Sequence, residues 1–458
     1  MLSDSSARRI LYPLTAAAVL AYFCFFTWKS VALYFDNDDM MNLYFAWSRP
    51  LSDVVRPVGG LFYRAMFAVA GFNPVPFRMV CLAIGIGNMG LCWWFARLVS
   101  QSDRVAALAV LLFAFHSRLM EVWFRTAVVY DLLCFTFFYL AACLYIDARR
   151  RGRMPGTVRG IVILLFFLCA LGSKEVAIAL PVVLLAYEVL FERFAWRGLW
   201  LIATIALIDL PYMYAKTHGV NALTNNPFYR SEYSLSRFAQ NWALFLNYLL
   251  ILTKAVNPGV AVIVIAGLLA IALAVRSRQL IFAWLVLFAC TLPLLFLPYR
   301  GAYVLYLAYT GWTLYAAVCL VAAQDWVTRS QPQYRTVLAC VVFALVAWRW
   351  GKLNLHDQRI DPRPWLYQSQ AQVHQMADRM LALEPAFPKG ARILFLDDPF
   401  GTDEWTPWFI VKLLYRDDTL TVDRIKMMDR KPGEWSNWQY VFAFRNNRYT
   451  LVKPGSRQ

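Results

Sequence analysis

An apolar run near the beginning of the chain decides the fold class: ILYPLTAAAVLAYFCFFTWKSVAL, residues 10–33. An α-helix needs about 20 predominantly apolar residues to cross the hydrocarbon core of a bilayer, and this run is long enough. Arg8 and Arg9 precede it, as basic residues precede the apolar core of a signal peptide. The run is longer than such a core, and no cleavage site made of small residues follows it. We therefore expect a first membrane helix that stays in the protein.

Apolar runs of similar character recur along most of the chain. Of its 458 residues, 60% are hydrophobic and 16% are charged, whereas an average soluble domain has about 45–50% apolar and about 25% charged residues. We therefore expect a polytopic α-helical membrane protein with about 11 spans. The expected spans are residues 10–33, 78–99, 104–120, 127–146, 159–172, 176–192, 198–215, 259–275, 280–297, 302–323 and 336–350.

The net charge of +17 comes largely from the loops between these runs. Basic residues cluster in 147–159, 192–197 and 276–279, and lysine and arginine favour the cytoplasmic side of a membrane. Basic loops beside anionic lipid headgroups need no nucleic acid as a partner, and we expect none. This orientation places the N-terminus in the cytoplasm and the C-terminus outside it, in a protein of the cell (inner) membrane.

The stretch 238–256 is apolar enough to cross the membrane, although it also carries two asparagines, a glutamine and a lysine. If it crossed, the basic loops at 276–279 and 325–335 would lie outside, against the positive-inside rule. We therefore expect a re-entrant or interfacial segment, within a second outer loop of residues 216–258. A first outer loop, residues 34–77, contains a stretch of helical periodicity that we expect to lie along the membrane interface.

Residues 351–458 differ in character from the membrane part, which we assign to residues 1–350. Helical and strand patterns alternate here, and the last apolar stretch contains an Asn-Asn pair that is typical of a hairpin turn. The patterns predict, in order, a helix, a strand, a helix, a strand and a strand or hairpin, in residues 370–384, 391–398, 404–416, 419–426 and 439–452. We therefore expect a small soluble α/β domain on the extracytoplasmic side.

Charged residues collect at the span ends that this topology places outside. An ionisable side chain at membrane depth, or at the mouth of a helix bundle, is energetically costly and is therefore a functional candidate. We expect these outer turns to line one cavity. The candidates are Asp36, Asp38, Asp39, His116, Arg118, Glu121, Arg125, Asp131, Lys174, Glu175 and Arg300.

Three of these acids, Asp36, Asp38 and Asp39, lie within four residues in YFDNDDMMNLYFAW, residues 34–47. They can simply cap the helix that follows, where a carboxylate is favoured by about 0.3–1 kcal/mol. Close packing of carboxylates also raises the pKa of at least one of them, which suits a general base. The D-x-D spacing of Asp36 and Asp38 can instead hold a divalent cation such as Mg²⁺ or Mn²⁺.

The other candidates have structural alternatives as well. Lys174 can extend to the membrane interface and pair with Glu175, and His116 can be a satisfied histidine at the end of a helix. Arg300 lies close to two tyrosines at an outer turn, where its planar guanidinium can bind a phosphate through two hydrogen bonds.

The order of these elements resembles the GT-C superfamily of integral-membrane glycosyltransferases, especially its protein O-mannosyltransferase-like branch. FDNDDMMNLYFAW, residues 35–47, resembles the acidic motif in the first outer loop of that superfamily. LGSKEVAIALPVVLLAYE, residues 171–188, is similar to its [CS]-K-E-x-x-[VI]-x-[LV]-P motif. The resemblance covers roughly the first two thirds of the chain, and the C-terminal domain lies outside it.

Three further segments look like motifs of the same superfamily and occur in the same order. They are RPVGGLFYR (56–64), FHSRLMEVWFRTAVVYDLL (115–133) and PYRGAYVLYLAYTGW (298–312). Where the pattern has His and Asn after the first of these segments, this chain has Arg78 and Cys81, so the resemblance transfers no role to those two side chains.

The resemblance implies transfer of a hexose or pentose from a polyprenyl-phosphate donor to a hydroxyl acceptor outside the membrane, usually with inversion. The acceptor would be a glycan, a lipid or a protein of the cell envelope. An Asp of the first outer loop would be the base, with Asp38 matching best, Asp39 next and Asp36 after it. Substrate or phosphate binding would fall to charged residues at outer turns: Lys174, Glu175, Arg300, Glu121, His116, Arg56 and Asp131.

Two other functions remain open on the sequence alone. A transporter or flippase for a lipid-linked sugar would also use many spans and buried charges, although the sequence contains no visible half-repeat and no pair of broken helices. A non-catalytic membrane assembly subunit would use its outer domain to bind partner proteins. Substitution of the candidate base separates the three, because only a transferase would lose product while its fold is kept.

Overall fold

The computed structural model describes residues 4–192, 199–218, 222–428, 435–445 and 448–455. The chain divides into two compact units, each built from segments that are distant in the sequence. The first unit comprises Met1–Trp28, Cys81–Trp123 and Val128–Pro362. The second unit comprises Lys29–Val80, Phe124–Ala127 and Arg363–Gln458.

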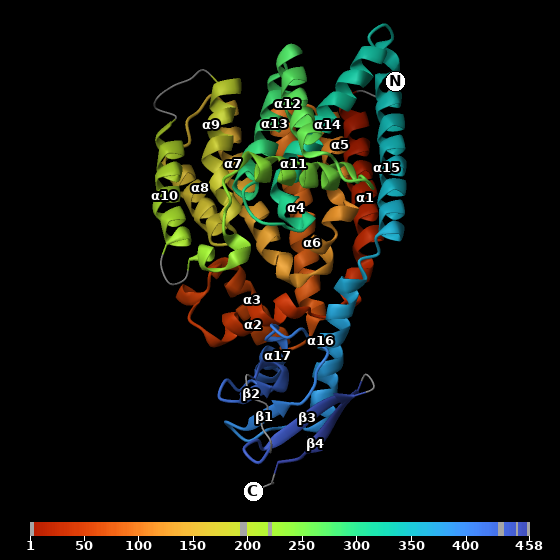
Figure 1. Ribbon diagram of the computed structural model, residues 1–458. Helices are drawn as coiled ribbons and strands as arrows, with labels where there is room; N and C mark the ends of the chain where they lie inside the picture. The colour runs from red at the N-terminus through yellow and green to blue at the C-terminus, as the bar shows by residue number, and fades with distance from the viewer. Residues whose placement is uncertain (1–3, 193–198, 219–221, 429–434, 446–447, 456–458) are drawn as a thin grey trace. The chain divides into compact units, whose positions relative to one another are not determined.

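The first unit is a bundle of α-helices (Figure 1). Two of its helices, α4 and α6, have one end in the second unit. The helices are α1 (Asp4–Thr27), α4 (Pro74–Ser100), α5 (Asp103–Ala114), α6 (Glu121–Phe124), α7 (Val129–Arg150), α8 (Thr157–Leu171), α9 (Leu180–Phe191), α10 (Leu199–Thr217), α11 (Leu235–Leu250), α12 (Pro258–Ala274), α13 (Arg278–Thr291), α14 (Tyr306–Val327) and α15 (Arg335–Ile360).

Six helical segments in the described part of the chain are long and apolar enough to cross a membrane. They are Tyr12–Ala32, Pro74–Ser100, Thr126–Arg150, Leu199–Thr217, Ala302–Val327 and Pro332–Ile360. A seventh span results if the bent pair Asp103–Ala114 and Ser117–Phe124, with 53° between them, crosses as one. The chain therefore has the membrane-helix character that its composition predicts.

The other four expected spans fall on shorter apolar helices, α8, α9, α12 and α13. The longest of them, α12, has 17 residues. At a rise of 1.5 Å per residue such a helix extends about 25 Å, which is less than the roughly 30 Å of a bilayer core. The expected number of about 11 spans therefore stays a prediction.

A close approach of α13 and α14 holds part of the bundle together. A Cβ atom on Gly311 would lie 2.5 Å from the backbone nitrogen of Leu287 and 2.7 Å from the carbonyl oxygen of Ala283. Small residues allow membrane helices to pack at this distance. Buried Tyr309 on the same helix donates a 3.0 Å hydrogen bond to the carbonyl oxygen of Leu112 on α5. Its hydroxyl thus finds a partner in apolar surroundings.

The stretch expected to lie at the interface forms α11, which runs across the other helices of its unit (Figure 1). This 16-residue helix has one buried face, with Trp242, Phe245 and Leu249, and is not among the helices long enough to span. Asn241 on that face donates to the carbonyl oxygen of Leu295 at 2.8 Å, so a buried amide is satisfied rather than exposed to lipid. The position of this helix at the membrane interface stays a prediction.

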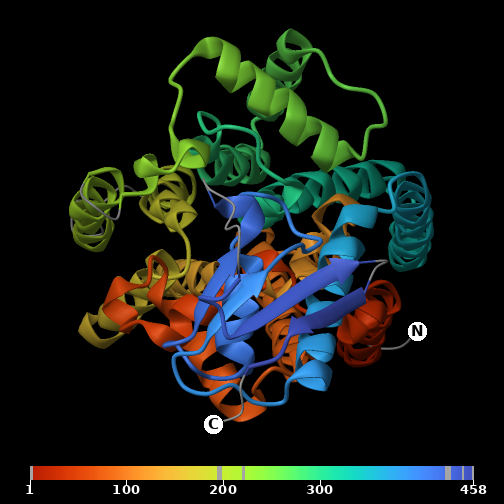
Figure 2. The ribbon, with the colours of Figure 1, turned by 60° about the horizontal axis from the view of Figure 1, so that its bottom comes forward.

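The second unit contains a four-stranded sheet with helices α16 (Pro364–Leu383) and α17 (Thr406–Leu414), together with α2 (Asn37–Ser48) and α3 (Pro57–Ala70). The strands are β1 (Arg392–Phe395), β2 (Thr421–Arg424), β3 (Tyr440–Arg445) and β4 (Arg448–Lys453), in the order β2-β1-β3-β4 (Figure 2). The central strand β1 is parallel to both neighbours, and its apolar residues are buried, as in sheets covered on both faces. The helices and strands lie where the sequence predicts them, and the expected turn Asn446–Asn447 lies outside the described residues.

The boundaries of the units differ from a simple division at residue 350. Helix α15 continues through this position to Ile360 and ends just before Pro362, because a residue that precedes proline disfavours helical geometry. The loop at residues 34–77 then belongs to the same compact unit as the C-terminal segment Arg363–Gln458. This grouping positions the acidic stretch of the first loop against elements that follow it by more than 300 residues.

Candidate functional site

The acidic stretch begins α2 with a complete capping box. Asp36 is the N-cap, and its carboxylate accepts a 3.0 Å hydrogen bond from the backbone N–H of Asp39. In return, the carboxylate of Asp39 accepts a 3.0 Å hydrogen bond from the backbone N–H of Asp36. Two of the donors that a helix start leaves unpaired are therefore satisfied. The capping role that the sequence allows for these acids is present, and it uses two of the three.

Asp39 is enclosed by its neighbours. Its side chain is buried, and its second carboxylate oxygen accepts a 2.9 Å hydrogen bond from the hydroxyl of Tyr63 on α3. Burial, and then repulsion from Asp36, raise the pKa of Asp39 to about 7, while the nearby cation of Arg78 opposes the rise. Because both oxygens are engaged and no face is open to solvent, Asp39 supports the helix start rather than meeting a substrate.

Asp38 is the acid that remains accessible. Its side chain is 57% exposed, whereas that of Asp36 is 3% exposed. The guanidinium of Arg125 bridges the two, with Nε donating to Asp36 and Nη2 donating to Asp38. Loss of solvation raises the pKa of Asp38, while the cation of Arg125 opposes the rise because it stabilises the ionised carboxylate. The arrangement presents one exposed carboxylate on a rigid, capped helix start, which is a geometry suited to a general base.

Arg125 is held in turn by the C-terminal elements. The carbonyl oxygen of Phe124, just before it, accepts a 2.8 Å hydrogen bond from the side chain of Gln370 on α16. The guanidinium of Arg125 also lies over the ring of Trp365, 5.7 Å from its centroid. The sequence shows Arg125 only as one of several charged residues at predicted outer turns, because its ion-pair partners lie 87 and 89 positions away.

Arg78 is a residue that the sequence left without a role. It is 1% exposed and donates one hydrogen bond, of 2.8 Å, to the carbonyl oxygen of Tyr34. Its Nε and Nη1 have no hydrogen-bond partner among the residues that the structure describes. Its charge acts on Asp39, which makes it an internal counter-ion of the capping box. In the sequence, the sign of this buried charge is a lone arginine within the apolar stretch NPVPFRMV.

The candidates of the first unit form separate pairs. Lys174 pairs with Asp131 through a contact of 2.5 Å, and both side chains are at least 90% buried. The ammonium of Lys174 also lies 5.1 Å from the ring centroid of Tyr303. Glu175 lies 3.9 Å from the ammonium of Lys216. A buried ion pair at the start of α7 keeps a cation in a setting of low dielectric constant, where its field on an anion is strong.

The remaining predicted residues differ in their surroundings. The guanidinium of Arg300 lies 4.1 Å from the ring centroid of Tyr229, and buried Glu121 lies near Gly301. His116 is packed between the rings of Tyr309 and Trp350 and accepts a hydrogen bond from the backbone of Arg118, as a structural histidine at a helix end would. Arg56, in the second unit, is the N-cap residue of α3 and is half-buried.

The structure thus brings Asp36, Asp38, Asp39 and Arg125 together in the second unit, and Lys174 and Asp131 together in the first. Within the described ranges, no group of three or more His, Cys, Asp or Glu side chains is arranged to hold a metal ion. The cation that contacts the carboxylates of both Asp36 and Asp38 is the guanidinium of Arg125.

Comparison of the chain with family models and with curated proteins finds no match. The resemblance to the GT-C superfamily therefore rests on the motifs themselves and on the site that they predict.

We expect the free energy of unfolding to fall as the pH rises from about 4 to about 7. The pKa of Asp39 is about 7 in the folded protein, against about 3.9 in an unfolded chain. Between these values the folded state binds more protons than the unfolded state, so a rise in pH favours unfolding. Denaturation of the purified protein in detergent at several pH values measures this. Asp39→Asn should flatten the dependence, and an unchanged slope would contradict the assignment.

Proposed function

We propose that this protein is an integral-membrane glycosyltransferase of the GT-C type. It moves a sugar from a polyprenyl-phosphate donor to a hydroxyl group on the outer side of the membrane. The observation that carries the proposal is the division of roles among the three acids. Asp36 and Asp39 close the capping box, while Asp38 stays exposed beside a guanidinium at the start of the same helix.

Asp38 is the general base of the proposed reaction. It accepts the proton of the acceptor hydroxyl while the acceptor oxygen forms a bond to the anomeric carbon of the donor sugar. The bond between this carbon and the phosphate oxygen breaks, and its electron pair leaves with the polyprenyl phosphate. Attack from the face opposite to the leaving group inverts the configuration at the anomeric carbon.

The departing lipid phosphate needs fixed positive charge. A cation that is already oriented in a site of low dielectric constant stabilises developing charge without reorganisation. We assign this role to Lys174, which is buried beside Tyr303, and to Arg300, whose guanidinium can bind a phosphate through two hydrogen bonds. Substrate contacts are assigned to the other charged residues at the outer turns: Glu175, Glu121, Arg56 and Asp131. His116, packed between the rings of Tyr309 and Trp350, is assigned a structural role instead.

The proposal includes about 11 membrane spans, with the N-terminus in the cytoplasm and the C-terminal domain outside the cell membrane. In the described part of the chain, six helices and one bent helix pair are long and apolar enough to span, and they support the membrane location in this proposal. A hydroxyl acceptor of the cell envelope, whether glycan, lipid or protein, would then meet Asp38 on that side.

A cysteine introduced at Asp403 is expected to react with a membrane-impermeant maleimide in intact cells. Asp403 is exposed in the C-terminal domain, whereas nearby Phe400 is buried and would give no signal from either side. The matched control is Arg153→Cys in the predicted cytoplasmic loop, which should react only after permeabilisation. The unsubstituted protein reports the background of the native cysteines. Labelling of Asp403→Cys only after permeabilisation would place the C-terminal domain in the cytoplasm.

Mass spectrometry of glycolipids, surface glycans and glycoproteins in a deletion strain tests the function itself. We expect one glycan to lose a sugar while its lipid-linked donor accumulates, because the donor is still made and no longer consumed. The wild-type gene should restore the product. Unchanged glycans would contradict a transferase, and accumulation of the donor on the cytoplasmic face alone would indicate a flippase.

A further inference from the structure

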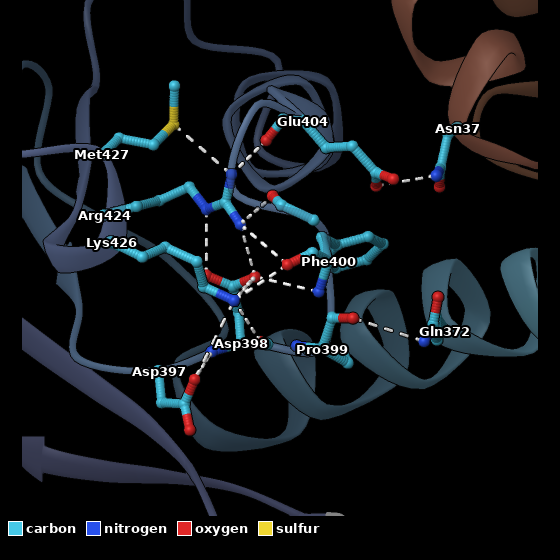
Figure 3. Close-up of polar contacts among 11 residues, drawn as sticks. Asn37, Gln372, Asp397, Asp398, Pro399, Phe400, Glu404, Arg424, Lys426 and Met427 are labelled. Carbon is cyan, nitrogen blue, oxygen red and sulfur yellow. Dashed lines mark hydrogen bonds and ion pairs between the residues drawn. The ribbon is translucent and has the colours of Figure 1, made fainter.

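The start of α2 is clamped by the C-terminal elements at the residue next to Asp38. The side-chain amide of Asn37 donates a 2.8 Å hydrogen bond to the carboxylate of Glu404 (Figure 3). The backbone N–H of Asn37, one of the donors that a helix start leaves unpaired, points to the hydroxyl of Ser369 on α16 at 3.4 Å. Two segments that follow Asn37 by more than 300 residues therefore hold the turn that carries Asp38.

Glu404 also determines the orientation of the Asn37 amide. An ionised carboxylate accepts hydrogen bonds and cannot donate them, so the amide must turn its nitrogen toward Glu404. The amide oxygen of Asn37 is then directed elsewhere, and it is buried without a hydrogen-bond partner in the part of the chain that the structure describes. The contact thus fixes both the place and the direction of the side chain that precedes Asp38.

The loop that carries Glu404 is itself fixed by a buried arginine at the end of β2. Arg424 donates to both carboxylate oxygens of Asp398, at 2.9 and 2.6 Å, and each side chain is at most 2% exposed. The same guanidinium donates to the carbonyl oxygens of Gly401 and Glu404 (Figure 3). One side chain thereby ties the end of β1 to the backbone of Glu404, and a loop with this many bonds has little freedom to move.

Lys426, two residues after Arg424, reinforces the same loop. Its ammonium donates to the carbonyl oxygens of Asp398 and Phe400, at 2.6 and 2.8 Å. These cationic contacts lie at the carboxyl ends of β1 and β2, the edge at which parallel sheets place functional loops. In this protein the bonds at that edge of the sheet hold the loop that carries Glu404, and Glu404 in turn accepts the hydrogen bond from Asn37.

We propose that Glu404 is a positioning residue for Asp38. This inference rests on the proposed function, in which Asp38 is the base. Glu404 acts through Asn37: it holds the first turn of α2 in the orientation in which Asp38 meets the acceptor hydroxyl. A displacement of about 1 Å in a reacting group lowers a rate by about 100-fold, so a hydrogen bond one residue away is sufficient to matter. The C-terminal domain is then part of the catalytic apparatus.

The test compares two substitutions at Glu404 in the full-length protein. Membranes of the deletion strain, carrying each variant and their own lipid-linked sugars, are supplied with radiolabelled sugar precursor, and label in the glycan is measured over time. Glu404→Ala removes the acceptor and should lower the initial rate by about 10- to 100-fold. Glu404→Gln keeps an oxygen that accepts from Asn37 and should retain most of the rate. Asp403→Ala, at the exposed neighbouring acid, should equal the wild type.

A double variant shows whether Glu404 acts through Asn37. Asn37→Ala and Glu404→Ala should each lower the rate, and the double variant should be no slower than the worse of the two. Additive losses, or equal losses in Glu404→Ala and Glu404→Gln with a lower thermal midpoint in both, would show a merely structural role and overturn the inference. A wild-type rate in Glu404→Ala would do the same.

The failure of this inference can be told apart from failure of the proposed function. If Asp38→Asn abolishes transfer and Glu404→Ala does not slow it, only the positioning role is wrong. If Asp38→Asn transfers sugar at the wild-type rate, the proposed function is wrong. Hydrogen exchange of the amides at the start of α2 supplies a readout without substrate, and it should be faster in Glu404→Ala than in Glu404→Gln.

Discussion

Asp38→Asn is expected to lower the rate of sugar transfer by about 10²–10⁴-fold, the usual contribution of a general base. The amide cannot accept the proton of the acceptor hydroxyl, although it fills the same space. The fold should be kept, because Asp38 is largely exposed and the capping box uses Asp36 and Asp39 instead. The measurement is the transfer of radiolabelled sugar in membranes of the deletion strain, with expression and thermal midpoint determined for the same samples.

Asp53→Asn is the matched control for this substitution. Asp53 is another exposed acid of residues 34–77, and its carboxylate accepts a 3.1 Å hydrogen bond from the hydroxyl of Ser52. We expect it to transfer sugar at the wild-type rate. Asp39→Asn provides the second comparison, since a buried capping acid should affect stability more than the rate. Normal product in both Asp38→Asn and Asp39→Asn would mean that the acids of this loop do not carry the chemistry.

Arg125→Gln is expected to lower the free energy of unfolding by about 3–5 kcal/mol, the range found when one partner of a buried ion pair is removed. Its partner Asp36 is 3% exposed, so the carboxylate would remain in the protein without its cation. The contact with Asp38 adds little to stability because Asp38 is exposed. Chemical denaturation in detergent measures the change, and sugar transfer should fall with it because Asp38 loses the same cation.

A second substitution identifies the cause of this loss. Asp36→Asn keeps a side chain that caps a helix well and removes the buried charge. The double variant Arg125→Gln with Asp36→Asn should therefore be more stable than Arg125→Gln alone. Arg379→Gln, at an exposed position of α16, should change the stability by less than about 0.5 kcal/mol. A double variant no more stable than Arg125→Gln would show that Arg125 acts by packing rather than by charge.

Helices and strands that depend on neighbouring residues lie close to the positions that the sequence predicts. The helices and strands of the C-terminal domain lie in the expected order, since each depends on a period of apolar residues within one segment. The number of membrane spans is harder to predict from the sequence, because helices such as α8 and α12 are apolar but too short to cross a bilayer by themselves. Helix length depends on where the chain turns, and tertiary packing decides that as much as composition does.

For the candidate site, the sequence by itself determined what is local. The run at residues 10–33 is long enough for a membrane, and the acids at residues 36–39 stand where they can cap the helix that follows, through contacts within one turn. Both follow from neighbouring residues and need no other part of the chain.

Only the tertiary structure decided which of the three acids is available. Asp36 and Asp39 are buried at the start of α2, where Tyr63 binds Asp39, whereas Asp38 is exposed. Its partner Arg125 lies 87 residues away in the sequence. Glu404 reaches Asn37 across 367 residues. Ion pairs and hydrogen bonds of this kind act only at contact distance, and a sequence does not state which distant segments will share a compact unit until the chain has buried its apolar surface.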